Sequence, residues 1–190
     1  VIARQAFDGL GTDTWSITAG SGNTSATAGG TDTPSNQRIL SGTGSWQVNN
    51  GTATLDLADL DLNGYSNISV QVRLSSPSVN ATNGSDGGDY VRLFLALDGG
   101  SFPGTADVQV SGNNNARYGY GATGIVNSTA GTPSSVTAPS GGTITTGYAT
   151  INTSIPDGTN SVRLRIVALN DATNEIWAVD DIQITGDYCA

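Results

Sequence analysis

The chain has 190 residues, a formal net charge of −9, and a composition of 12% charged and 36% hydrophobic residues with 26 glycines. Its seven basic residues are scattered arginines, which excludes the clustered positive charge of nucleic-acid binding. The chain has no run of about 18 apolar residues for membrane insertion. It also lacks the histidine and lysine used in most nucleophilic catalysis. We therefore expect a non-enzymatic protein, and the low charge and the richness in Gly, Thr and Asn fit an extracellular or cell-surface location.

About ten segments in which apolar and polar residues alternate predict β-strands. They span residues 14–18, 37–40, 45–48, 52–57, 68–74, 90–97, 107–110, 149–151, 162–168 and 176–184. Turn-forming pairs such as Asn50-Gly51 and Asn63-Gly64 separate them, whereas residues 112–147 predict a long loop or several short edge strands. Strands at this spacing favour one all-β domain over residues 1–190, an antiparallel two-sheet jelly-roll sandwich.

The last predicted strand carries two adjacent aspartates, Asp180 and Asp181. Because side chains alternate along a strand, we expect Asp180 on the face of Ile182 and Ile184, and Asp181 on the face of Trp177. A carboxylate on a buried face needs an arginine, backbone N–H donors or a metal ion. The residues alone leave these alternatives open.

Two further stretches offer oxygen ligands. "NGSDGGDY" places Asp86 and Asp89 on a glycine-rich loop, and "LNDATNE" forms a loop before the last strand. Carboxylate and amide oxygens are ligands for hard cations, calcium above all. Solvated turns are the alternative reading of both stretches. We predict calcium as a cofactor, with Asp86 and Asp89 among its ligands.

The aromatic residues divide into two groups. Trp15, Trp46 and Trp177 lie in strand-like segments, which favours core packing. Tyr118 and Tyr120, in "ARYGYG", are the best candidates for exposed rings that stack on a sugar, and packing within a loop is the alternative.

A family resemblance is carried by "AFDGL" with "DTW", by "DGGDYVRLFLALDGG" and by "IPDGTNSVRLRIVALNDATNEIWAVDDIQITG". These stretches resemble secreted jelly-roll β-sandwich modules of bacterial extracellular and surface proteins, similar in layout to MAM-like, laminin-G-like and calcium-containing carbohydrate-binding modules. The resemblance covers about residues 5–186. It implies a structural calcium between an acidic residue near the N-terminus, Asp8 here, and an aspartate of the last strand, Asp180 or Asp181. Modules of this fold serve many functions, so the resemblance implies the fold more strongly than the function.

Three functions are compatible with these features. The first is a non-catalytic structural or adhesive protein, a calcium-stabilised surface or filament subunit that forms a homo-oligomer or polymer by adding its N-terminal segment as a strand to a neighbouring copy. The second is a carbohydrate-binding module with a polysaccharide partner, and the third is an accessory domain of a secreted hydrolase. The residues expected to donate the strand are Val1, Ile2, Ala3, Arg4, Gln5, Ala6 and Phe7.

Overall fold

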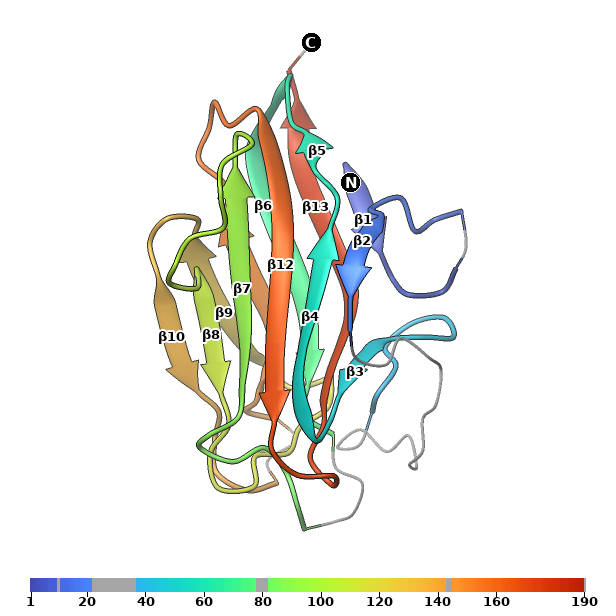
Figure 1. Cartoon of the computed structure of the whole chain (residues 1–190), viewed down its shortest axis with the longest axis vertical. Helices are drawn as coiled ribbons and strands as arrows, with labels where there is room; N and C mark the ends of the chain where they lie inside the picture. Colours follow the sequence, from blue (N-terminus) through green and yellow to red (C-terminus); the bar gives the residue numbers. More distant parts are fainter. Residues whose placement is uncertain (10, 22–36, 78–81, 143–144, 190) are drawn as a thin grey trace.

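The structure is a computed structural model that describes residues 1–9, 11–21, 37–77, 82–142 and 145–189. These residues form two β-sheets that pack face to face (Figure 1). In this view the sheet that contains β7 and β12, called sheet B, lies in front of the sheet that contains β6 and β13, called sheet A. Within these ranges there is no helix long and apolar enough to cross a membrane. The predicted all-β sandwich is confirmed.

Sheet A has six strands and sheet B has seven in the described part of the chain. Sheet A runs in the order β1 (Ala3–Gln5), β13 (Trp177–Tyr188), β6 (Tyr65–Ser75), β11 (Tyr148–Ser154) and β9 (Gly124–Thr129), with β3 (Trp46–Val48) also paired to β13. Sheet B runs in the order β10 (Ser134–Thr137), β8 (Val108–Ser111), β7 (Tyr90–Leu97), β12 (Ser161–Asn170), β4 (Gly51–Leu57) and β2 (Ile17–Gly20), with β5 (Leu60–Asp61) also paired to β12. Neighbouring strands are antiparallel except at one edge of each sheet, where β10 pairs with β8 and β9 pairs with β11 in parallel.

The strand order is that of a jelly roll. Its eight main strands lie in two rows, β1-β13-β6-β11 in sheet A and β4-β12-β7-β8 in sheet B. From each of these eight strands to the next along the chain, the chain changes sheet, except from β7 to β8, which pair antiparallel in sheet B. The first and last strands are neighbours, so the two ends of the sequence meet in sheet A.

One apolar core fills the space between the sheets. Every second side chain is buried along β12 and along residues 68–74 of β6, the pattern of strands with one face on a core. Trp15, Trp46 and Trp177 lie in this core without exposed surface, which confirms their predicted role. Each indole N–H donates to a backbone carbonyl oxygen at 2.8–3.0 Å, so burial leaves these nitrogens paired.

Most predicted strands are confirmed with small shifts at their ends, and β7 has the predicted bounds. Residues 37–40 form no strand, because their backbone turns toward the side chain of Asp180 instead of a neighbouring strand. The strand β5 is not predicted, since two residues are too few to show an alternation. The irregular stretch 112–147 supplies the edge strands β9 and β10.

A β-bulge interrupts β13 at the two aspartates. Asp180 pairs with Arg73 of β6, and the next pair is Gln183 with Gln71, so β13 has one more residue than β6 over this stretch. Asp181 has φ +44° at this point, a left-handed conformation that fits the bulge.

The bulge changes which residues share a face. Val179 and Ile182 both belong to the core, although strict alternation would place them on opposite faces. Asp180 lies opposite Arg73 on the other face of sheet A, and Asp181 pairs there with Arg4. The predicted facing of both aspartates is therefore wrong, because an inserted residue shifts the alternation by one position.

Candidate functional site

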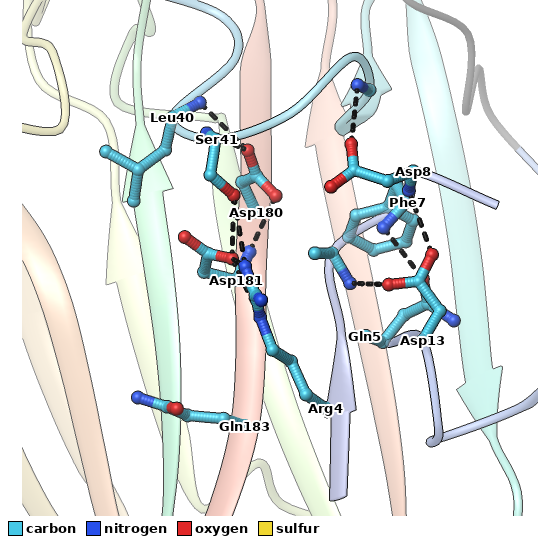
Figure 2. A network of polar contacts seen from close by, with 12 residues as sticks. Arg4, Gln5, Phe7, Asp8, Asp13, Leu40, Ser41, Asp180, Asp181 and Gln183 are labelled. Carbon is cyan, nitrogen blue, oxygen red and sulfur yellow. Dashed lines mark hydrogen bonds and ion pairs between the residues drawn. The ribbon is translucent and has the colours of Figure 1, made fainter. Parts of the chain in front are cut away.

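A network of aspartates lies beneath the loop 37–44, which covers the outer face of sheet A at β13 (Figure 2). Asp180 has no exposed surface. Its carboxylate accepts hydrogen bonds from the backbone N–H groups of Leu40 at 2.8 Å, Ser41 at 3.1 Å and Asp181 at 2.7 Å. Burial raises the pKa of Asp180 to about 7, while these three donors act in the opposite direction.

Asp181 has an arginine partner. Its Oδ1 accepts hydrogen bonds from the guanidinium of Arg4 and, at 2.9 Å, from the hydroxyl of Ser41. Because the two charged side chains are 34% and 21% exposed, we expect the ion pair to contribute at most about 1 kcal/mol. The contact nevertheless links β1, β13 and the loop 37–44.

Asp8 holds the same loop from its other side. Its Oδ1 accepts hydrogen bonds from the N–H groups of Thr43 at 2.6 Å and Gly44 at 3.2 Å. Figure 2 shows Asp8 and Asp180 at different stretches of the loop. Asp13, which sequence reasoning missed, accepts three backbone N–H bonds from residues 6–9. A calcium ion shared by Asp8, Asp180 and Asp181 stays a prediction.

Replacing Gly42 by alanine is expected to destabilise this network. A Cβ at Gly42 would lie 2.1 Å from both carboxylate oxygens of Asp8, and its φ of +62° already disfavours a side chain. Gly9 is a matched control, because its φ is +66° but a Cβ there meets nothing within 4 Å. We expect Gly42→Ala to cost about 2 kcal/mol more than Gly9→Ala in urea unfolding, and equal costs would contradict the steric argument.

Tyr118 and Tyr120 do not form a sugar-stacking platform. Each is 1% exposed, and burial raises the pKa of both phenols well above the usual range. Tyr118 packs so closely on Gly147 that a Cβ there would lie 2.0 Å from its ring. The hydroxyl of Tyr120 donates to the carbonyl oxygen of Arg38 at 3.1 Å. The prediction of exposed rings is wrong, because both residues fill the junction between sheet and loops.

A second acidic site combines the two stretches that look like solvated turns in the sequence. Asp89, Asp171 and Glu175, here called the acidic triad, each place one carboxylate oxygen within 4.8 Å of the other two. Asp89 and Glu175 are buried, whereas Asp171 is exposed. Asp86 stands beside the triad and accepts a hydrogen bond from the N–H of Asn115 at 2.8 Å. Three oxygens at this spacing can hold a metal ion.

The outer face of sheet B carries a cleft of about 320 Å³, here called the outer cleft. Its lining comes from β7, β8, β10 and the loop that precedes β8, and includes Arg92, Phe94, Thr105, Gln109, Ser134 and Ser135. The register places Arg92 opposite Gln109, and Gln109 opposite Ser135, so their side chains form one row across three strands.

Polar contacts fix the row in place. The guanidinium of Arg92 stacks on the ring of Tyr90, 3.7 Å from its centroid, and its Nε donates to Gln109 Oε1 at 2.6 Å. The amide of Gln109 donates in turn to the hydroxyl of Ser111 at 2.8 Å. Sequence reasoning missed this site because outward-facing polar residues on a strand resemble an ordinary solvated face. The available signal is the outward alternation Tyr90, Arg92, Phe94.

No protein-family model matches the chain, and no curated protein matches its sequence. Among solved structures it is similar to TmCBM61 in complex with β-1,4-galactotriose, with a TM-score of 0.45 and 10% identity, covering 96% of this chain and 95% of that chain. It is also similar to the CBM22-1 xylan-binding domain from Paenibacillus barcinonensis Xyn10C, with a TM-score of 0.44 and 11% identity, covering 100% of this chain and 96% of that chain. The class that the strand order defines is an all-β jelly-roll sandwich.

Proposed function

We propose that the protein is a non-catalytic extracellular β-sandwich module that binds carbohydrate in the outer cleft. The observation that carries this proposal is the row of Arg92, Gln109 and Ser135 beside the ring of Phe94. Sugars present hydroxyl groups around an apolar ring face, so a site for them combines fixed donors and acceptors with an aromatic surface. The resemblance in layout to calcium-containing carbohydrate-binding modules agrees with this function but speaks mainly for the fold.

The charge of the outer cleft favours binding over hydrolysis. Among the described residues that line the cleft, Arg92 is the single charged residue and none is a carboxylate. A glycosidase of the common type needs two carboxyl groups that flank the scissile bond. A single arginine among hydroxyl and amide groups instead suits a polysaccharide that carries some negative charge, such as a uronic-acid polymer.

The test is a binding screen on soluble neutral and uronic-acid polysaccharides, by affinity electrophoresis and then isothermal titration calorimetry. We expect Phe94→Ala and Gln109→Ala to weaken binding at least about tenfold, because each removes a contact surface of the cleft. Gln71→Ala is the matched control, since Gln71 has a similar half-buried position on the outer face of sheet A.

Two results would contradict the proposal. One is the absence of binding to every polysaccharide in the screen at millimolar sugar concentration. The other is a ligand whose affinity falls equally in Gln71→Ala and Gln109→Ala, since such a ligand does not use the outer cleft.

A second candidate function is self-association, as a structural or adhesive subunit. It is favoured by β1, an edge strand of three residues that pairs with β13 of the same chain and follows a Val1 that is 79% exposed. A short terminal strand can be exchanged between copies, so that each β1 pairs with the β13 of a neighbour. Light scattering across a concentration series tests this proposal, and a constant monomer mass up to about 1 mM would contradict it.

A further inference from the structure

The acidic triad lies at the end of sheet B that is opposite the C-terminus, the lower end in Figure 1. Asp89 belongs to the loop before β7, and Asp171 and Glu175 belong to the turn between β12 and β13. Because β7 and β12 are antiparallel neighbours, with Tyr90 opposite Leu169, the start of one strand meets the end of the other. The topology therefore brings three carboxylates together from distant parts of the sequence.

Hydrogen bonds hold the loop before β7 against the end of β12 without a ligand. The two oxygens of Asp89 accept hydrogen bonds from the N–H of Asp86 at 2.6 Å and from the N–H of Asp171 at 3.0 Å. The side-chain amide of Asn170 donates to the hydroxyl of Ser85 at 3.1 Å, which joins the same two segments. The carboxylates are thus held close by contacts that do not neutralise their charge.

Two buried oxygens at this place have no hydrogen-bond partner among the described residues. Glu175 is 5% exposed, and its Oε2 accepts no hydrogen bond. Asn170 has no exposed surface, and its Oδ1 is also unpaired. A buried acceptor without a donor is destabilising, more so when it is charged, so one at the end of β12 and one in the turn after it indicate a missing positive partner.

No ion pair between described residues supplies that partner. The two ion pairs of the described residues join Arg4 to Asp181 and Arg165 to Asp56, on other strands. The three carboxylates therefore lie together without an ion-pair partner among the described residues, and a bound cation would supply one.

We propose that the acidic triad binds a divalent cation with the ligand chemistry of calcium. Oxygens that lie within 4.8 Å of one another fit around calcium, whose Ca–O distance of about 2.3–2.6 Å places opposite ligands about 4.6–5.2 Å apart. The three ligands are carboxylates, and Asn170, the last residue of β12, has an unpaired neutral amide oxygen next to Asp171 in the sequence. This site is distinct from the predicted calcium site at Asp8 and Asp180, and it is independent of sugar binding in the outer cleft.

The experiment uses the full chain after treatment with a chelator and dialysis. Isothermal titration with calcium chloride is expected to show binding at the triad, and thermal unfolding is expected to shift upward in about 5 mM calcium because the ion binds the folded state. Asp171→Asn and Glu175→Gln should each weaken calcium binding at least about tenfold and reduce the thermal shift. Asp171 is exposed, so its variant keeps the test valid if Glu175→Gln does not fold.

Asp59→Asn is the matched control, because it removes one exposed carboxylate at a position outside the triad. Its calcium affinity should equal that of the wild-type protein. The proposal is overturned if about 5 mM calcium gives neither heat nor a thermal shift, or if Asp171→Asn binds calcium as tightly as Asp59→Asn. It is also overturned if only Asp8→Asn abolishes binding, since that result places the ion in the network beneath the loop 37–44.

Discussion

Trp177→Ala is expected to lower the free energy of unfolding by about 3–5 kcal/mol, the usual cost of truncating a large buried aromatic residue. Trp177 has no exposed surface, and its indole N–H donates to the carbonyl oxygen of Leu169 at 3.0 Å. The variant therefore creates a cavity at the start of β13 and removes the partner of a carbonyl group of β12. A domain of this size typically has about 5–15 kcal/mol of stability in total, so the variant is expected to lose a large part of it.

Urea unfolding followed by circular dichroism measures this cost, with an unchanged slope as the sign that the same surface is exposed. Trp177→Phe should lose less, because it retains most of the ring volume. Ile125→Ala is the control for truncation of an apolar strand residue, since Ile125 is 53% exposed on β9 and should change stability by less than about 0.5 kcal/mol. A loss below about 1 kcal/mol for Trp177→Ala would contradict the assigned core position.

The sandwich is predictable because its central strands bury one face, which requires apolar and polar residues to alternate along the sequence. In β6 and β12 the apolar residues recur at every second position, and β7 adds a largely apolar stretch between turn-forming glycines. Short edge elements lack this information. The three residues of β1 and the two of β5 owe their strand conformation to neighbours that are distant in sequence.

The candidate sites depend on the pairing of strands that are distant in sequence, and this pairing cannot be predicted from local sequence patterns. The bulge at Asp181 arises where β13 meets β6, so the facing of Asp180 follows from a register that local alternation cannot reveal. The acidic triad likewise requires the adjacency of β7 and β12, two strands that are separated by about a third of the sequence. Tyr118 and Tyr120 lie in a glycine-rich segment with no periodicity, so their burial has no local signal either.

Asp180→Ala is expected to cost at least about 2 kcal/mol, because it leaves three backbone N–H groups without their acceptor. Two of them, from Leu40 and Ser41, fasten the loop 37–44 to sheet A, and the third belongs to Asp181 at the bulge. Asp180→Asn should cost less, since the amide oxygen can still accept hydrogen bonds from the loop. Equal losses in the two variants, measured by urea unfolding with a chelator present, would show that these hydrogen bonds do not stabilise the loop.

The pH dependence of the stability of the wild-type protein and of Asp180→Asn tests the burial of Asp180. Its pKa is about 7 in the folded protein and 3.8 for an ordinary aspartate, so between these values the folded state binds more protons than the unfolded state. The stabilising contribution of protonated Asp180 is therefore complete below about pH 4 and is lost as the pH rises through 7. The stability difference between wild type and Asp180→Asn should shrink over this range, because asparagine does not titrate. A difference that stays constant from pH 4 to 8 would mean that Asp180 is ionised throughout, and that its three N–H donors outweigh the effect of burial.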